Sequence, residues 1–248
     1  MLALLAAMKA EIEPLKRHME IQRQLGDNIC PVIEGCYRGQ QALLVQTGVG
    51  GHRAETAVKH VLDHYPVQVI LSLGFAGGLV SGLKAGELVI CQRLVHGQSP
   101  AMESASTLVE LGKRVAKSSD ACLVTVSRPA NQRRQKEELA QKYSAQAVDM
   151  ESYWIAAEAG RRGIPCLVVR AISDPVDSDL PNLESVSSGS GEWNKREAFF
   201  YFASHPLETL RLSHLYFGNR RAKRNLVSFV NGFVSAYHNQ TNDLGAKS

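Results

Sequence analysis

Two short segments of this sequence each place a carboxylate at the edge of a buried apolar run. Residues 167–169 are apolar and mostly β-branched, which predicts a buried strand with Ser173 and Asp174 near its carboxyl end. Glu151 begins a segment whose apolar residues recur at helical spacing until Gly163 ends it. Ligands bind at the carboxyl ends of strands in open α/β sheets, so Asp174 is a candidate site residue. The dipole of the predicted helix lets Glu151 keep its charge at modest cost.

The same alternation of apolar runs and helical patterns extends along most of the chain and predicts a layered α/β fold. Residues 1–8 are expected to form a buried first strand. They do not resemble a signal peptide, because no basic stretch precedes them and charged residues follow at once, and they are too short to span a bilayer. Further strands are predicted at residues 42–45, 67–73, 88–91 and 122–126, and helices at residues 11–18, 52–64 and 132–142.

Two glycine-rich segments follow predicted strands. Residues 47–51 contain three glycines between a strand and a helix, and the backbone N–H groups of such a turn can approach an anion. Arg53 follows in the first helical turn, where a cation opposes the helix dipole, so Gly48 and Arg53 are candidate phosphate-binding residues. A simple tight turn is the alternative, because the pattern is neither a Walker loop nor GxGxxG. Residues 74–79 predict a second turn, and both turns could face one site.

Composition narrows the class of protein. The chain has 248 residues, 44% of them hydrophobic and 21% charged, which is typical of one globular domain, here with a tail. A net charge of +4 gives no strong case for nucleic-acid binding. The 5 cysteines are odd in number and form no CxxC motif, which argues against a disulfide framework or a zinc site and suits a reducing cytoplasm.

The C-terminal tail has a different character. Residues 185–191 form a Ser/Gly-rich loop, and the aromatic run at residues 198–202 and spaced apolar residues from 207 to 233 predict two or three amphipathic helices. Arginine and lysine residues cluster between these helices, at residues 220–224. The tail is expected to be either a helical cap with a solvated basic face or a surface for a membrane, an acidic partner or a lipidic substrate.

Five collinear motifs carry a resemblance to a known family. The chain resembles the purine/uridine phosphorylase superfamily, and most closely its 5'-methylthioadenosine/S-adenosylhomocysteine nucleosidases and hopanoid-associated nucleoside phosphorylases. The motifs are AMKAE at residues 7–11, TGVG at 47–50, GFAGGL at 74–79, VDMES at 148–152 and VRAISD at 169–174. The resemblance implies a three-layer α/β fold with a twisted mixed central sheet flanked by helices. It also implies a homodimer or higher homo-oligomer, no metal, no cofactor, and cleavage of the bond between ribose and a base.

The resemblance covers residues 1–182, which we expect to form the catalytic domain, with residues 183–248 as a loop and helical extension packed on it. It implies that Asp174 is the general acid at the purine N7, held by Ser173, and that Glu151 binds the ribose hydroxyls. Glu11 matches the base that activates water. The other implied site residues are Met150, Phe75, Ala76 and Gly77 for the substrate, and Gly48, Arg53 and Arg170 for phosphate or water.

Two departures from the nucleosidases affect the expected reaction. Phe75 stands where those enzymes have a serine that contacts the nucleophile, and no aromatic residue is present near residues 128–130 to stack on the base. We therefore expect a nucleoside phosphorylase that uses inorganic phosphate as co-substrate and acts on a purine nucleoside, such as adenosine with a bulky or apolar 5' substituent. The alternatives are a nucleosidase that uses water and a catalytically silent nucleoside-binding protein. A Rossmann-type oxidoreductase is disfavoured, because no GxGxxG follows the first strand.

Overall fold

The first strand, β1 (Leu2–Ala6), is buried along its whole length, as the sequence predicts. The computed structural model describes residues 1–26, 29–178 and 206–245, with the side chains of the last helix described from residue 220 to 242. Successive side chains of a strand point to opposite faces of the sheet. Leu2 and Leu4 therefore enter one hydrophobic core, whereas Ala3 and Leu5 enter another.

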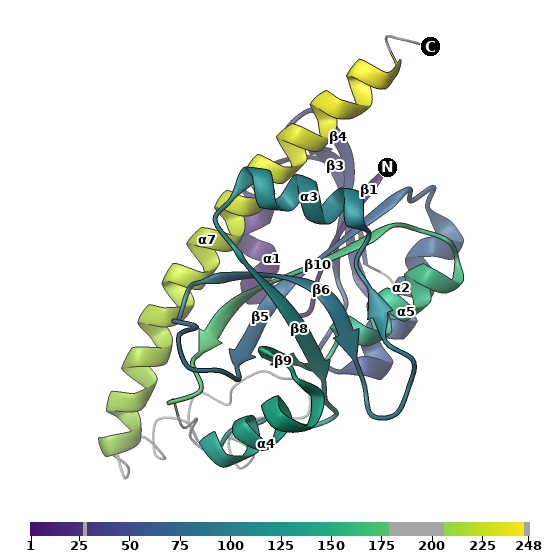
Figure 1. The fold of residues 1–248 in the computed structure, drawn as a ribbon. Helices are drawn as coiled ribbons and strands as arrows, with labels where there is room; N and C mark the ends of the chain where they lie inside the picture. Colours follow the sequence, from purple (N-terminus) through teal and green to yellow (C-terminus); the bar gives the residue numbers. More distant parts are fainter. Residues whose placement is uncertain (27–28, 179–205, 246–248) are drawn as a thin grey trace.

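Ten strands of the described residues form one mixed sheet around β1. The strands β2, β3, β4, β1 and β5 lie side by side, and β5, β10, β6, β8 and β9 pair in a closed circuit, so this half of the sheet curls round on itself (Figure 1). The bounds are β2 (Met19–Gly26), β3 (Pro31–Tyr37), β4 (Gln40–Gln46), β5 (Val69–Gly78), β6 (Leu88–Val95), β7 (Met102–Glu103), β8 (Ser119–Thr125), β9 (Ala147–Asp149) and β10 (Cys166–Asp174).

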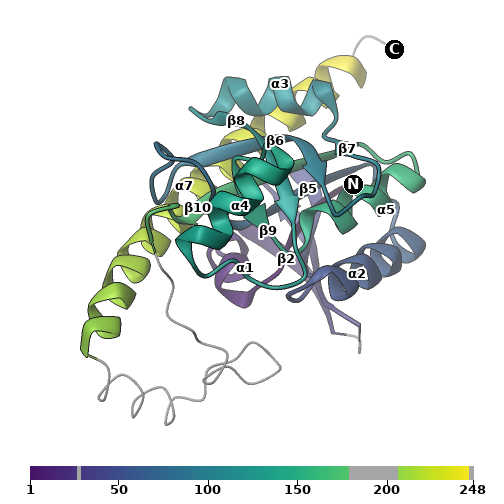
Figure 2. The same ribbon diagram turned by 60° about the horizontal axis from the view of Figure 1, so that its bottom comes forward.

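Helices cover both faces of the sheet. On one face lie α1 (Lys9–Lys16), α3 (Ser106–Val115) and α7 (Pro206–Gly245), and on the other lie α2 (Gly51–His64) and α5 (Ser152–Arg161) (Figures 1 and 2). The helix α4 (Arg133–Tyr143) packs beside β8 and β9 through a smaller apolar cluster. The expected α/β fold, a mixed central sheet flanked by helices with a C-terminal helix, is confirmed.

The described part of the tail is one helix, α7, and not the expected two or three. The basic residues at 220–224 do not interrupt it, because Arg220, Arg221 and Arg224 are exposed while Ala222 between them is buried. A helix tolerates charges that face solvent. The predicted loop at residues 185–191 and the aromatic run at 198–202 lie outside the described residues. In the part of the chain that the structure describes, no helix is both long enough and apolar enough to cross a membrane.

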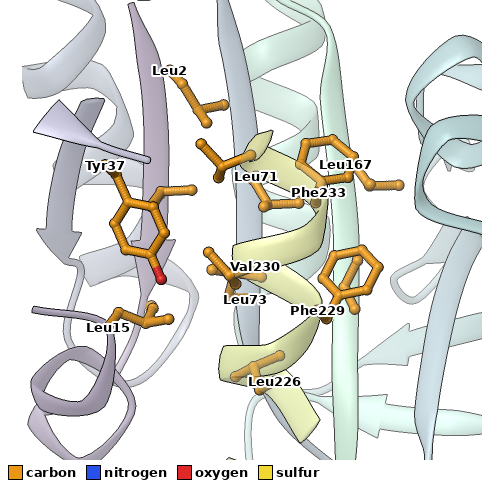
Figure 3. Packing of buried hydrophobic residues seen from close by; sticks show 14 of the residues in the cluster. Leu2, Leu15, Tyr37, Leu71, Leu73, Leu167, Leu226, Phe229, Val230 and Phe233 are labelled. Atoms are coloured by element: carbon orange, nitrogen blue, oxygen red, sulfur yellow. The ribbon is translucent and has the colours of Figure 1, made fainter. Parts of the chain in front are cut away.

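The helix α7 completes the main hydrophobic core. Figure 3 shows four α7 side chains against the sheet: Leu226, Phe229, Val230 and Phe233. Asn231 accepts a hydrogen bond from the hydroxyl of Tyr37, on β3, at 2.8 Å. Removing α7 would expose this core to water, so the helix is part of the fold that positions the site.

The prediction of a second glycine-rich turn at residues 74–79 is wrong. Residues 74–78 continue β5, with β10 paired along one side and β9 paired at the end. The glycines are needed because carboxylates come close to this strand. A Cβ atom on Gly74 would lie 3.1 Å from Oε1 of Glu11, and one on Gly77 would lie 3.1 Å from Oδ2 of Asp174. Glycine inside a strand often marks such a close approach.

Candidate active site

Three neighbouring strands bring the sequence motifs together. In β5, Gly74 and Phe75 pair with Arg170 and Ala171 of β10, and Gly77 pairs with β9 just before Glu151. The register of β10 against β5 shifts between Ile172 and Asp174, which leaves Ser173 as an extra residue. Bulges of this kind redirect side chains and are common next to active sites. The bulge therefore decides where Asp174 points.

Asp174 is 6% exposed and both of its carboxylate oxygens have a partner. Its Oδ1 atom lies 2.5 Å from the Ser173 hydroxyl, so the expected pairing of these two side chains is present. Its Oδ2 atom lies 2.7 Å from Nζ of Lys136, a residue of α4 that is 0% exposed. No pattern in the sequence distinguishes Lys136 from the other charged residues of α4.

Glu11 lies in the first turn of α1 and is 3% exposed. The backbone N–H of Phe75 donates to its Oε1 atom at 2.9 Å, and that of Met8 donates to its Oε2 atom at 2.8 Å. Burial raises the pKa of Glu11, although these two hydrogen bonds and the charge of Arg170 oppose the rise. The carboxyl is thus held in one orientation and has a raised pKa, as suits a general base.

Glu151 is the N-cap residue of α5, and its Oε1 atom accepts a hydrogen bond from the Gly50 N–H at 2.7 Å. Burial, and next the negative charge of Asp149, raises the pKa of Glu151 to about 7. The expectation that this carboxylate keeps its charge at modest cost is therefore wrong. Desolvation and a neighbouring carboxylate outweigh the favourable helix dipole.

Arg170 forms a buried ion pair with Asp149, a residue of the VDMES motif for which no role was predicted. Its Nε atom lies 3.0 Å from Oδ2 of Asp149, and its other donors reach the carbonyl of Val169 at 2.9 Å and the hydroxyl of Ser72 at 3.1 Å. Arg170 is 2% exposed. Since three of its hydrogens are engaged, Arg170 has reduced capacity to bind a phosphate ion.

Glu11, Glu151 and Arg170 border one small cavity between β1, β5 and α5. Its volume is about 10 Å³, which is room for a single water molecule. The remaining lining residues are Ala6, Ala7, Thr47, Leu73, Gly74, Phe75 and Ile155. Three polar or charged side chains that converge on a water-sized space form a site where water can be held and deprotonated. Among the described residues, no group of three or more His, Cys, Asp or Glu side chains could hold a metal ion.

The glycine-rich turn at residues 47–50 borders this region, but several of its N–H groups are already used. The Gly48 N–H donates to the carbonyl of Ala7 at 3.1 Å, and the Gly50 N–H donates to Glu151. Gly48 has a φ of +78°, and a Cβ atom there would lie 3.0 Å from Cδ of Arg53. Arg53 itself is exposed. A phosphate site at Gly48 and Arg53 would need these N–H groups to change partners.

The other expected substrate residues lie along the same strands. Met150 is half-buried between β9 and α5, and Phe75 is half-buried against the main core. Ala76 is buried, and its carbonyl lies 3.2 Å from the Ser173 hydroxyl. Gly77 lies beside Asp174, as described above. The structure therefore places Phe75, Ala76 and Gly77 in the last part of β5 beside β10, and Met150 directly after β9.

Most of the chain matches a known protein family. The family model described as the phosphorylase superfamily matches residues 1–198. The chain belongs to this superfamily. The matched range contains every candidate site residue named above. The resemblance to this superfamily that the five motifs indicate is therefore confirmed.

Curated relatives at about one-quarter identity are nucleosidases by name. The chain is 27% identical over 195 residues to a 5'-methylthioadenosine/S-adenosylhomocysteine nucleosidase of Geobacillus kaustophilus, covering 69% of this chain and 83% of the relative. It is 25% identical over 200 residues to an aminodeoxyfutalosine nucleosidase of Helicobacter pylori, covering 71% and 86%. A solved 5'-methylthioadenosine/S-adenosylhomocysteine nucleosidase of Neisseria meningitidis, in complex with methylthio-immucillin-A, has a TM-score of 0.77 at 22% identity, covering 95% of this chain and 98% of that one. This last likeness shows the fold alone.

The raised pKa of Glu151 predicts that Glu151→Gln stabilises the protein in alkaline solution. The folded protein keeps a proton on Glu151 that the unfolded chain releases above its ordinary pKa of 4.5, so stability falls as pH rises from there to about 7. Glutamine removes this penalty and can still accept the hydrogen bond from Gly50. The variant should gain on the order of 1–3 kcal/mol in the free energy of unfolding at about pH 8 and little at about pH 4, measured by urea denaturation. The exposed Glu20→Gln is the control, and a gain that is the same at both pH values would contradict the assignment.

Proposed function

We propose that this superfamily member is a nucleosidase that hydrolyses the N-glycosidic bond of a purine nucleoside. The observation that carries the proposal is the water-sized cavity bordered by Glu11, Glu151 and Arg170. A buried acid with a raised pKa, an adjacent arginine and a space for one water are the parts that deprotonation of a water nucleophile needs. The names of the curated relatives support the same reaction.

Cleavage of the bond between ribose and base gives a transition state with oxocarbenium character, so charge must be stabilised at both ends. At the sugar, Glu151 would accept hydrogen bonds from the ribose hydroxyls, and Glu11 would take a proton from the water that attacks C1'. At the base, Asp174 would pass a proton to N7 as electrons move onto the leaving group. Ser173 fixes the orientation of that carboxyl.

The replacement of serine by Phe75 does not disturb the base in this mechanism. Glu11 is oriented by the backbone N–H of Phe75 and not by its side chain. Any residue except proline supplies that donor. Phe75 therefore leaves the proposed base oriented, although it does not supply the hydroxyl that contacts the nucleophile in the nucleosidases.

Phosphorolysis, the reaction expected from the sequence, has less support. Of the two glycine-rich segments invoked for phosphate, one is a strand, and the other has its Gly48 and Gly50 N–H groups bonded to Ala7 and Glu151. Arg170 is engaged with Asp149. The cavity as it stands is also too small for a phosphate ion.

Adenine nucleosides with a 5' substituent are the first substrates to test, because 5'-methylthioadenosine and S-adenosylhomocysteine appear in the names of the relatives. The protein is expected to release free ribose derivative and base at the same rate with and without inorganic phosphate, as measured by chromatography of both products. A sugar 1-phosphate formed only in phosphate would replace hydrolysis with phosphorolysis. Tight binding of these nucleosides without any cleavage would instead favour the catalytically silent alternative.

A further inference from the structure

A groove with basic walls lies between the C-terminal end of α1 and the middle of α7 (Figure 1). Its volume is about 610 Å³, which is within the range of small-molecule sites. It shares no lining residue with the cavity of the candidate active site, so it is a separate feature of the surface. Five residues with permanent positive charge line this basic groove: Arg17, Arg220, Arg221, Lys223 and Arg224.

The basic groove concentrates positive charge without an acidic neighbour. Among the described residues that line it there is no aspartate and no glutamate. In the part of the chain that the structure describes, Arg17, Lys223 and Arg224 form no ion pair with a carboxylate. By comparison, Arg133 and Arg134 of α4 each pair with a glutamate one helical turn away. The charges of the groove are therefore left for a partner outside the chain.

The spacing of these charges opposes the stability of α7. Arg224 follows Arg220 by four residues and Arg221 by three, so like charges are neighbours on the helix surface and repel one another. They lie in the middle of the helix, where the helix dipole gives no compensation. Between Glu208 and Asp243 the sequence of α7 contains no acidic residue, whereas an ordinary solvated helix face mixes both signs. An anion bound among these side chains would relieve the repulsion.

The turn before β6 holds one of the arginines in place. The aliphatic part of Arg221 packs over Gly86, where an added Cβ atom would lie only 2.5 Å from Cγ of the arginine. Asn225, one turn further along α7, donates to the Gly86 carbonyl at 2.7 Å. The stem of Arg221 is therefore packed while the residue still lines the basic groove. Such packing reduces the side-chain entropy that is lost when a ligand binds.

The composition of the basic groove indicates phosphate groups as its ligand. The planar guanidinium group donates two parallel hydrogen bonds to a phosphate, and four of the five cations are arginines. A membrane surface fits less well, because the apolar residues among the described lining are only Pro14 and Val227, both half-buried. The cations also converge from two helices on a hollow and do not cover a flat face.

We propose that the basic groove binds a soluble small molecule that carries two or more phosphate groups. Arg17 approaches this ligand from the end of α1, and Arg221 and Arg224 approach it from α7, so the ligand bridges the two helices. The site is distinct from the one that would cleave a nucleoside. The inference therefore goes beyond the proposed function and does not depend on it.

The test is a calorimetric titration of the whole chain with inorganic tripolyphosphate, at a constant ionic strength of about 0.15 M. The wild-type protein should bind one equivalent. The double variant Arg17→Gln/Arg224→Gln should bind at least roughly tenfold more weakly, because charge-assisted hydrogen bonds are lost. The matched control is Arg114→Gln/Lys117→Gln, which removes the same charge from exposed residues outside the groove. Its affinity should change less than about twofold.

An equal loss of affinity in both double variants would show attraction to net charge alone and would overturn the site, as would the absence of saturable binding. Binding to vesicles of phosphatidylglycerol and phosphatidylcholine, without binding to tripolyphosphate, would make the groove part of a membrane surface instead. If the groove variant does not fold, the wild-type chain provides a second measurement. Tripolyphosphate should then raise its Tm more than sulfate does at the same ionic strength, and equal shifts would contradict the proposal.

Discussion

Replacing Glu11 with glutamine is expected to lower kcat by about 10² to 10⁴-fold, the usual contribution of general acid–base catalysis. The amide oxygen of glutamine can still accept the hydrogen bond from the Phe75 N–H, so the side chain should keep its place. It cannot take a proton from water. We therefore expect KM to change little while kcat falls, as measured by steady-state kinetics with a 5'-substituted adenine nucleoside.

The control for this variant is Glu13→Gln, because Glu13 lies on the same helix and is exposed. Its kcat should remain at the wild-type value. A phosphate nucleophile would not need a base, so a Glu11→Gln variant with near wild-type turnover would point to phosphorolysis. A fall in kcat/KM caused only by a higher KM would instead assign Glu11 to substrate binding.

Local patterns predicted the elements that carry the candidate acids. The apolar, β-branched run of β10 indicated a buried strand, and the polar pair at its end indicated Ser173 and Asp174 as site residues. The helical spacing after Glu151 placed that carboxylate at the start of α5. The strand and the helix were predicted correctly because each depends on residues that are neighbours in sequence, where periodicity and structure-breaking residues dominate. The roles of Ser173 and Asp174 in a site stay predictions.

Local patterns failed where distant segments determine the structure. The glycines at residues 74–78 were predicted to form a turn, since glycine weakens a strand, but here they make space for Glu11 and Asp174. Lys136 lies in a highly charged helix, and no feature of that pattern distinguishes the one lysine that is buried against a carboxylate 38 residues away. Asp149 stood within a recognised motif, but its partner Arg170 lies 21 residues further along the chain.

Burying the Arg170 and Asp149 charges has a free-energy cost, and this cost should become measurable when only one of the two residues loses its charge. Asp149→Asn retains an oxygen that can accept from the Thr125 hydroxyl, at 2.8 Å in the wild-type protein, and from the Ser152 N–H. The Arg170 guanidinium, however, would remain buried without its ion-pair partner. We expect the free energy of unfolding to fall by about 3–5 kcal/mol, as measured by urea denaturation at neutral pH.

An exposed ion pair provides the matched control. Asp120 lies 2.8 Å from Nζ of Lys113 but is 53% exposed, so Asp120→Asn should cost less than about 1 kcal/mol. If Asp149→Asn costs equally little, Glu11 and Glu151 must neutralise Arg170 in its place, since both carboxyls border the same cavity. In that case Arg170 would hold the charge on these two carboxylates directly, and the variant should shift the pH dependence of turnover even though the fold is unharmed. A large loss of stability would instead identify Asp149 as the residue that fixes Arg170 beside the water-sized space.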